Sequence, residues 1–155
     1  MLHAAVETSQ MARLESAPKI RILIVEKHSA VRRALRKRLS ATSDLDVVAA
    51  VQTPEAALPY LSPDAGGCAN APDVVLLGLQ SESDEELSNT LAFVHQMVRC
   101  PAAVIVLAPY ADEVERLLLQ QAGVTSYLLK YIDSLRLIQE IEVVAGKGRS
   151  PILTS

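Results

Sequence analysis

The sequence has only two cysteines, Cys68 and Cys100, and neither lies in a CxxC pair or at metal-ligand spacing from a histidine. This pattern indicates a reducing compartment. No apolar run approaches 18 residues, which excludes a membrane span. Residues 1–19 lack the basic start and the unbroken apolar stretch of a signal peptide. We therefore expect a cytoplasmic protein.

An excess of positive charge is also absent. The chain has 15 Lys and Arg against 18 Asp and Glu, a net charge of −3, so it is not a nucleic-acid polycation. Half of its residues are hydrophobic, which excludes an intrinsically disordered chain. A length of 155 residues fits one domain, which folds without disulfides or a metal because it buries roughly two thirds of its unfolded surface.

Short apolar runs alternate with longer amphipathic stretches from residue 19 onward. Most of these runs lack period-two alternation, which is typical of strands covered on both faces in a parallel sheet. We expect tails at residues 1–18 and 147–155, the second as a tail or linker, around one domain at 19–146. The expected strands cover residues 20–25, 47–51, 74–77, 103–107 and 127–129.

Helical spacing of apolar residues fills the gaps between these runs. We expect Asp133 to cap the last helix and Gly123 to end the one before it. A helix starting at Thr53-Pro54 should break or kink at Pro59, and residues 62–72 should form a loop. Five β-α units predict a doubly wound α/β sandwich. The apolar stripes are Val31, Leu35, Leu39; Leu87, Leu91, Val94, Val98; Val114, Leu117, Leu118, Ala122; and Leu135, Ile138, Ile141.

Ligands of such sheets bind at the carboxyl ends of the strands. The chain has no GxGxxG or Walker loop, no GxSxG elbow and no HExxH motif, so the usual nucleotide sites and catalytic constellations are not recognisable. The residues expected at this edge are Glu26, Lys27, His28, Gly78, Ala108 and Lys130.

Four segments in this order, ILIV before Glu26, VVLL before Gly78, VIVL before Ala108 and SYLL before Lys130, resemble the receiver (CheY-like) domain of bacterial two-component response regulators. The resemblance covers about residues 19–146. It implies a flavodoxin-like (βα)5 sandwich with a five-stranded parallel sheet in the order 2-1-3-4-5.

The departures from the family pattern bear on function. The resemblance implies an acidic pair that holds Mg²⁺, a phospho-acceptor Asp, a Ser or Thr, and a Lys. This chain has Glu26-Lys27, Gly78 and Ala108 at the first three positions and keeps only Lys130, with Tyr127 at the switch aromatic position. Aspartyl phosphorylation needs a carboxylate nucleophile and a divalent ion. We therefore expect a degenerate pseudo-receiver that is not an enzyme, has lost its Mg²⁺ site and uses no cofactor.

The resemblance further implies a protein partner or a homodimer through the fourth helix, fifth strand and fifth helix. Residues 147–155 are similar to a linker that precedes a DNA-binding output domain in one response-regulator subfamily. We expect either a fragment of a transcription factor, with that domain beyond this sequence, or a stand-alone adaptor. We expect no membrane contact and no direct nucleic-acid contact by this domain.

Several alternatives stay open. The pocket could sense a small anion or metabolite, because Glu26, Lys27 and Lys130 together carry a net charge of +1, or Lys27 could pair with Glu26 and fix one conformation. A phosphorelay receiver with a displaced acceptor at Ser81 or Glu82 is a further alternative. The basic first helix is either a docking face or a solvated face; its cations are Arg32, Arg33, Arg36, Lys37 and Arg38.

Overall fold

The computed structural model describes residues 18–61, 72–80, 84–97 and 102–146. Outside it lie residues 1–17 and 147–155 of the expected tails, residues 62–71 of the expected loop, and Ser81, Glu82 and Val98. Its five strands form one parallel sheet in the order β2-β1-β3-β4-β5, which confirms the expected topology. The strands are β1 (Ile20–Val25), β2 (Leu45–Val51), β3 (Val74–Gly78), β4 (Ala103–Ala108) and β5 (Ser126–Leu129).

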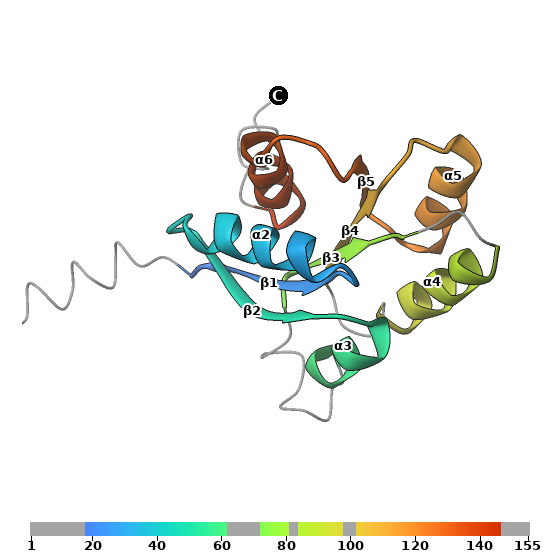
Figure 1. Ribbon diagram of the computed structural model, residues 1–155, viewed down its shortest axis with the longest axis horizontal. Coiled ribbons are helices and arrows are strands. Elements are labelled where there is room, and N and C mark those ends of the chain that lie inside the picture. Colours follow the sequence, from blue (N-terminus) through green and yellow to red (C-terminus); the bar gives the residue numbers. More distant parts are fainter. Residues whose placement is uncertain (1–17, 62–71, 81–83, 98–101, 147–155) are drawn as a thin grey trace, which may run out of the picture.

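Helices cover both faces of the sheet, with α2 and α6 on one side and α3, α4 and α5 on the other (Figure 1). None of the helices in the described ranges is long and apolar enough to cross a bilayer. The helices are α2 (Ser29–Ser40), α3 (Pro54–Leu61), α4 (Asp84–Met97), α5 (Glu113–Ala122) and α6 (Ser134–Val144).

Each central strand contributes to two hydrophobic cores. In β1, Ile22 and Ile24 pack in the core under α2 and α6, whereas Leu23 and Val25 pack in the core under α3, α4 and α5. Successive side chains of a strand point to opposite faces, so a sheet covered on both faces needs apolar residues at every position. This explains why the apolar runs lack alternation.

Local signals place the ends of α5 and α6 as expected. Asp133 caps α6, because its Oδ1 accepts hydrogen bonds from the backbone N–H groups of Leu135 at 2.8 Å and Arg136 at 3.3 Å. Gly123 follows α5 with φ 120°, a conformation that glycine adopts without the strain of a side chain.

Three helical predictions were wrong in their details. Val31, expected on the buried stripe of α2, is 36% exposed. The buried leucine of α5 is Leu119, whereas Val114, Leu117 and Leu118 are exposed. In α6 likewise, Leu137 is buried and Leu135 is exposed. Adjacent apolar residues fit more than one helical stripe, and packing against the sheet selects one of them.

Of the predicted break or kink at Pro59, the break is wrong, because α3 continues through Pro59 to Leu61, and the kink stays a prediction. Proline removes one backbone hydrogen bond within a helix. The loss is limited here because α3 has only eight residues and ends two residues after the proline.

Candidate functional site

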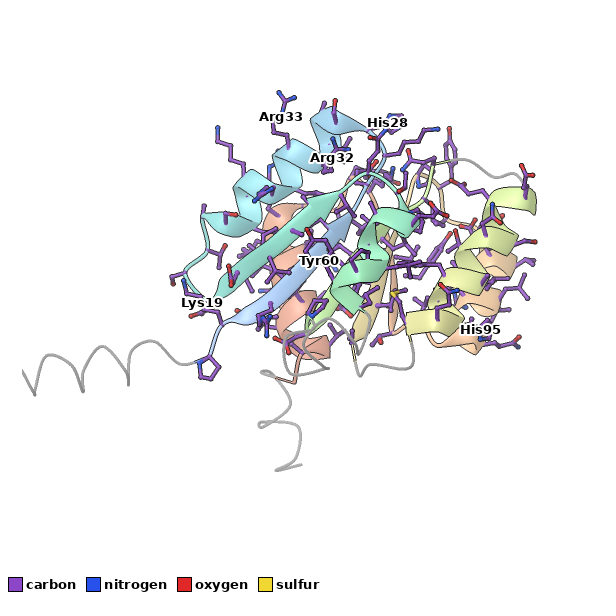
Figure 2. The ribbon with its side chains drawn as sticks, turned by 90° about the horizontal axis from the view of Figure 1, so that it is seen from below. Lys19, His28, Arg32, Arg33, Tyr60 and His95 are labelled. Carbon is purple, nitrogen blue, oxygen red and sulfur yellow. The ribbon has the colours of Figure 1, made fainter. Side chains whose placement is uncertain are left out.

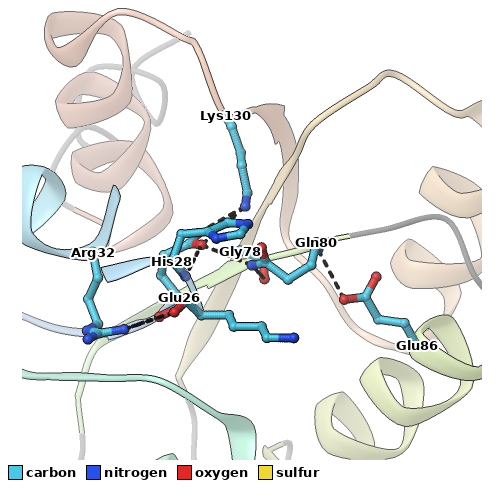
Figure 3. Close-up of polar contacts among 8 residues, drawn as sticks. Glu26, His28, Arg32, Gly78, Gln80, Glu86 and Lys130 are labelled. Atoms are coloured by element: carbon cyan, nitrogen blue, oxygen red, sulfur yellow. Dashed lines mark hydrogen bonds and ion pairs between the residues drawn. The ribbon is translucent and has the colours of Figure 1, made fainter. Parts of the chain in front are cut away.

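The carboxylate of Glu26 lies at the centre of the carboxyl edge of the sheet. Glu26 directly follows β1 and its side chain is only 1% exposed. Lys130, which follows β5, places Nζ 3.1 Å from Oε1 and 3.3 Å from Oε2 of Glu26. Oε2 accepts a hydrogen bond from Lys130, whereas Oε1 is held by the ion pair alone (Figure 3). The two opposite charges therefore neutralise each other inside the site.

Gly78 provides the space that this carboxylate occupies. Gly78 is the last residue of β3, the strand beside β1. A Cβ atom at position 78 would lie 2.0 Å from Oε1 of Glu26 and 3.5 Å from Cε of Lys130. The carboxylate from β1 thus fills the volume in which any side chain at the end of β3 would begin.

Two further donors hold Glu26 in this place. The backbone N–H of His28 and Nε2 of Gln80 each donate to Oε2 at 3.0 Å. Gln80 is itself positioned by the carbonyl of Gly78, to which Nε2 also donates at 3.2 Å, and by Glu86 Oε2, which accepts from the Gln80 backbone N–H at 3.1 Å. A buried carboxylate is stable only with such partners.

Sequence reasoning missed Gln80 and Glu86. Gln80 stands two residues after Gly78, at the same edge of the sheet, and this position was a usable signal. Glu86 lies in the first turn of α4, where its acidic side chain also suits the helix dipole. His28 is the N-cap residue of α2 without a side-chain cap, and it contributes its backbone N–H, not its imidazole, to the Glu26 site.

Lys27 does not join the ion pair. Its side chain is exposed and, among the described residues, makes no ion pair with Glu26, so the suggested Lys27–Glu26 pairing is not what the structure shows. Lys27 instead lines a neighbouring hollow of about 250 Å³ between the starts of α3 and α4, which Gly78, Gln80 and Glu86 also line.

The position expected to carry a hydroxyl is apolar and closed. Ala108, the last residue of β4, is fully buried, and its carbonyl accepts a hydrogen bond of 2.8 Å from the backbone N–H of Lys130. This contact brings the ends of β4 and β5 to the Glu26 site, but Ala108 contributes no polar side chain to it.

Tyr127 of β5 is half-buried and its hydroxyl group is fully engaged. The hydroxyl donates to Glu115 Oε1 at 2.5 Å, lies 3.1 Å from the carbonyl of Tyr110, and accepts from the backbone N–H of Asp112 at 3.3 Å. Burial, followed by the hydrogen bond and the charge of Glu115, raises the pKa of Tyr127 well above its ordinary value. The ring is thereby tied to the start of α5.

These residues do not fit the Mg²⁺ ion that the receiver fold implies. Mg²⁺ needs a near-octahedral shell of oxygen ligands. Glu26, the one buried carboxylate among the described residues, is bound to an ammonium group, Gly78 has no carboxylate, and Lys27 adds a cation. Within the described ranges, no three His, Cys, Asp or Glu side chains gather as a metal site.

Comparisons with known proteins give the fold. A scan of protein-family models and a search of curated proteins find no match. Among solved structures, the signal receiver domain of the response regulator NarL from Mycobacterium tuberculosis has a TM-score of 0.68 and 22% identity, over 86% of this chain and 100% of that chain. A DNA-binding response regulator of the LuxR family from Staphylococcus aureus has a TM-score of 0.67 and 16% identity, over 82% and 99%.

The signal receiver domain of a Luxo repressor protein from Vibrio parahaemolyticus is similar in the same way, with a TM-score of 0.66 and 18% identity over 88% of this chain and 98% of that chain. Five parallel strands in the order 2-1-3-4-5, alternating with five described helices, are common to this architecture. The chain therefore has the flavodoxin-like fold of response-regulator receiver domains.

Proposed function

We propose that this protein is a receiver-like signalling module that works without aspartyl phosphorylation, through contacts with a protein partner or a second copy. The observation that carries the proposal is the Glu26 carboxylate, which fills the space above Gly78 and neutralises Lys130. The site thus holds an internal carboxylate, paired with Lys130, where phosphoryl transfer would require an accessible nucleophile and a metal.

Glu26 is itself a poor substitute for the nucleophile. It is 1% exposed, and its oxygens are engaged by an ammonium group, an amide N–H and a backbone N–H. Attack on a phosphoryl donor requires a carboxylate oxygen in line with the phosphorus atom. Glu26 would have to break these contacts first and leave Lys130 as a half-buried cation without its partner.

The outer part of the site supports one fixed state. Ala108 offers no hydroxyl for a phosphoryl oxygen, and the Tyr127 hydroxyl is bound by groups of α5 and of the segment before it. Without a hydroxyl at Ala108, the pocket has no polar group that could pull the Tyr127 ring inward from these contacts. We therefore expect the surface around β5 to keep one conformation, in which it can contact a partner.

That face is apolar enough to bind a partner. On α5, Val114 is 66% exposed, and next to β5 and α6, Tyr131 is 76% exposed. Tyr131 also lines a hollow of about 430 Å³, together with Tyr127, Ile132 and Arg136 among others. Exposed apolar clusters of this kind mark interaction surfaces. Any linked DNA-binding output domain would be controlled through this face.

The alternative of a small-anion sensor at the same pocket has less support. It needs a free cation beside Gly78, but Lys130 is already paired with Glu26. Lys27 lines its hollow together with two acids, Glu55 and Glu86, so that lining carries more negative than positive charge.

The deciding experiment is intact mass spectrometry after incubation with acetyl phosphate and Mg²⁺, beside a receiver that has its acceptor Asp as the positive control. We expect no phosphoryl adduct on this chain. Treatment with hydroxylamine distinguishes an acyl phosphate from lysine acetylation, because only the acyl phosphate is cleaved. A phosphoryl adduct overturns the proposal, whether it is a hydroxylamine-sensitive acyl phosphate at Glu26 or Glu82 or a hydroxylamine-resistant phosphoserine at Ser81.

A further inference from the structure

The second feature of chemical interest lies on α2, away from the Glu26 carboxylate. Residues 27–40 contain six Lys or Arg and no Asp or Glu, whereas the rest of the chain has nine Lys or Arg against 18 acids. The protein as a whole is acidic, with a net charge of −3, but α2 is strongly basic. Such a local field attracts anions even when the whole molecule repels them.

Three of these arginines surround one hollow. It measures about 140 Å³ and is lined by Ser29, Arg32, Arg33 and Arg36 of α2 and by Ala50 of the edge strand β2. Figure 2 shows Arg32 and Arg33 on the half of α2 next to His28, with Arg33 projecting outward. The volume corresponds to a few water molecules at about 30 Å³ each, which is enough for one compact group.

The arginines differ in how they are held. Nη1 of Arg32 donates to the backbone carbonyls of Glu26 at 2.8 Å and Lys27 at 3.2 Å, which fixes its guanidinium and leaves other N–H groups for a ligand. Arg33 and Arg36 make no ion pair with any acid in the described part of the chain. No acid lines the hollow, so three like charges lie together without compensation.

We propose that this hollow is a binding site for the phosphate group of a small ligand, a phosphomonoester or a pyrophosphate. Guanidinium groups form paired hydrogen bonds with phosphate oxygens, and their geometry favours this group over a single point charge. Ser29 adds a hydroxyl donor. A bound dianion removes the repulsion among the three arginines, so binding also stabilises the start of α2. The site is independent of phosphoryl chemistry at Glu26.

The test is isothermal titration calorimetry of the full chain with inorganic pyrophosphate at low ionic strength. Two double variants remove the same charge: Arg33→Gln/Arg36→Gln changes the hollow, and Lys37→Gln/Arg38→Gln changes neighbouring residues that do not line it. The control also removes an exposed hydrogen bond of 3.2 Å from Arg38 to Ser134 Oγ of α6. We expect binding by the wild type, a loss of about tenfold or more for the first variant, and little change for the second. Circular dichroism shows that both variants are folded.

Three outcomes overturn the proposal. The first is an absence of pyrophosphate binding by the wild type. The second is an equal loss in both double variants, which shows a diffuse electrostatic attraction. The third is binding to duplex DNA but not to pyrophosphate, which identifies α2 as a polyanion surface and not a site for a small ligand.

Discussion

At the scale of single residues, Gly78 and the carboxylate of Glu26 share one small volume. In a Gly78→Ala variant, the new Cβ forces the carboxylate away from Lys130 and Gln80, because Oε1 would lie only 2.0 Å from it. We expect the free energy of unfolding to fall by about 1–3 kcal/mol, measured by urea denaturation. The matched control is Glu26→Ala/Gly78→Ala, in which the clash is gone. Its loss should be smaller than the sum of the two single losses, and strict additivity contradicts the shared volume.

A second residue-scale prediction concerns Tyr127 at alkaline pH. Its pKa is raised in the folded state, so the folded protein keeps this proton at pH values where the unfolded chain, with a pKa near 10.0, has lost it. The stabilisation is complete below pH 10 and is lost as pH rises further. We expect Tyr127→Phe to be less stable than the wild type near neutral pH but to lose less stability above pH 10. Thermal unfolding over a pH series checks this, and parallel pH profiles for the two proteins argue against the hydrogen-bonded hydroxyl.

At the scale of elements, helix caps stabilise the ends of the helices that cover the sheet. Asp133 provides both capping bonds at the start of α6, and α6 covers one core through Leu137 and Ile141. We expect Asp133→Ala to cost about 1 kcal/mol and to lower Tm by about 2–4 °C in calorimetry. Asp133→Ser retains a capping oxygen and should recover most of the loss. Equal losses for Ala and Ser would mean that the cap is not the source of the effect.

At the scale of the whole molecule, the apolar side chains around α5 and β5 predict association. We expect concentration-dependent self-association in sedimentation velocity if the partner is a second copy, and Leu117→Glu should shift the protein to monomer without unfolding it. The control is Val31→Glu, since Val31 is also exposed but lies on α2, across the sheet from α5. An equal effect of both variants, or a monomer at every concentration, contradicts a homodimer through this face.

Much of the overall fold could be predicted from the sequence. The strand order agrees with the resemblance to receiver domains. The alternation of strands and helices and the ends at Asp133 and Gly123 agree with the sequence patterns. These features depend on local rules: runs of β-branched residues, capping side chains and a positive φ angle. The buried face of α5 could not be predicted, since three consecutive leucines satisfy several stripes and only the sheet beneath selects Leu119.

The candidate site divides in the same way. The sequence by itself determined which groups are present at the carboxyl edge: one carboxylate at Glu26, none at Gly78, no hydroxyl at Ala108 and an ammonium group at Lys130. Only the tertiary structure decided how they combine. Glu26 turns over Gly78 toward Lys130 and not toward the adjacent Lys27, and Gln80 joins it. The physical reason is that Glu26 and Lys130 are 104 positions apart and meet only in the folded sheet, where burial makes a paired carboxylate far more favourable than an unpaired one.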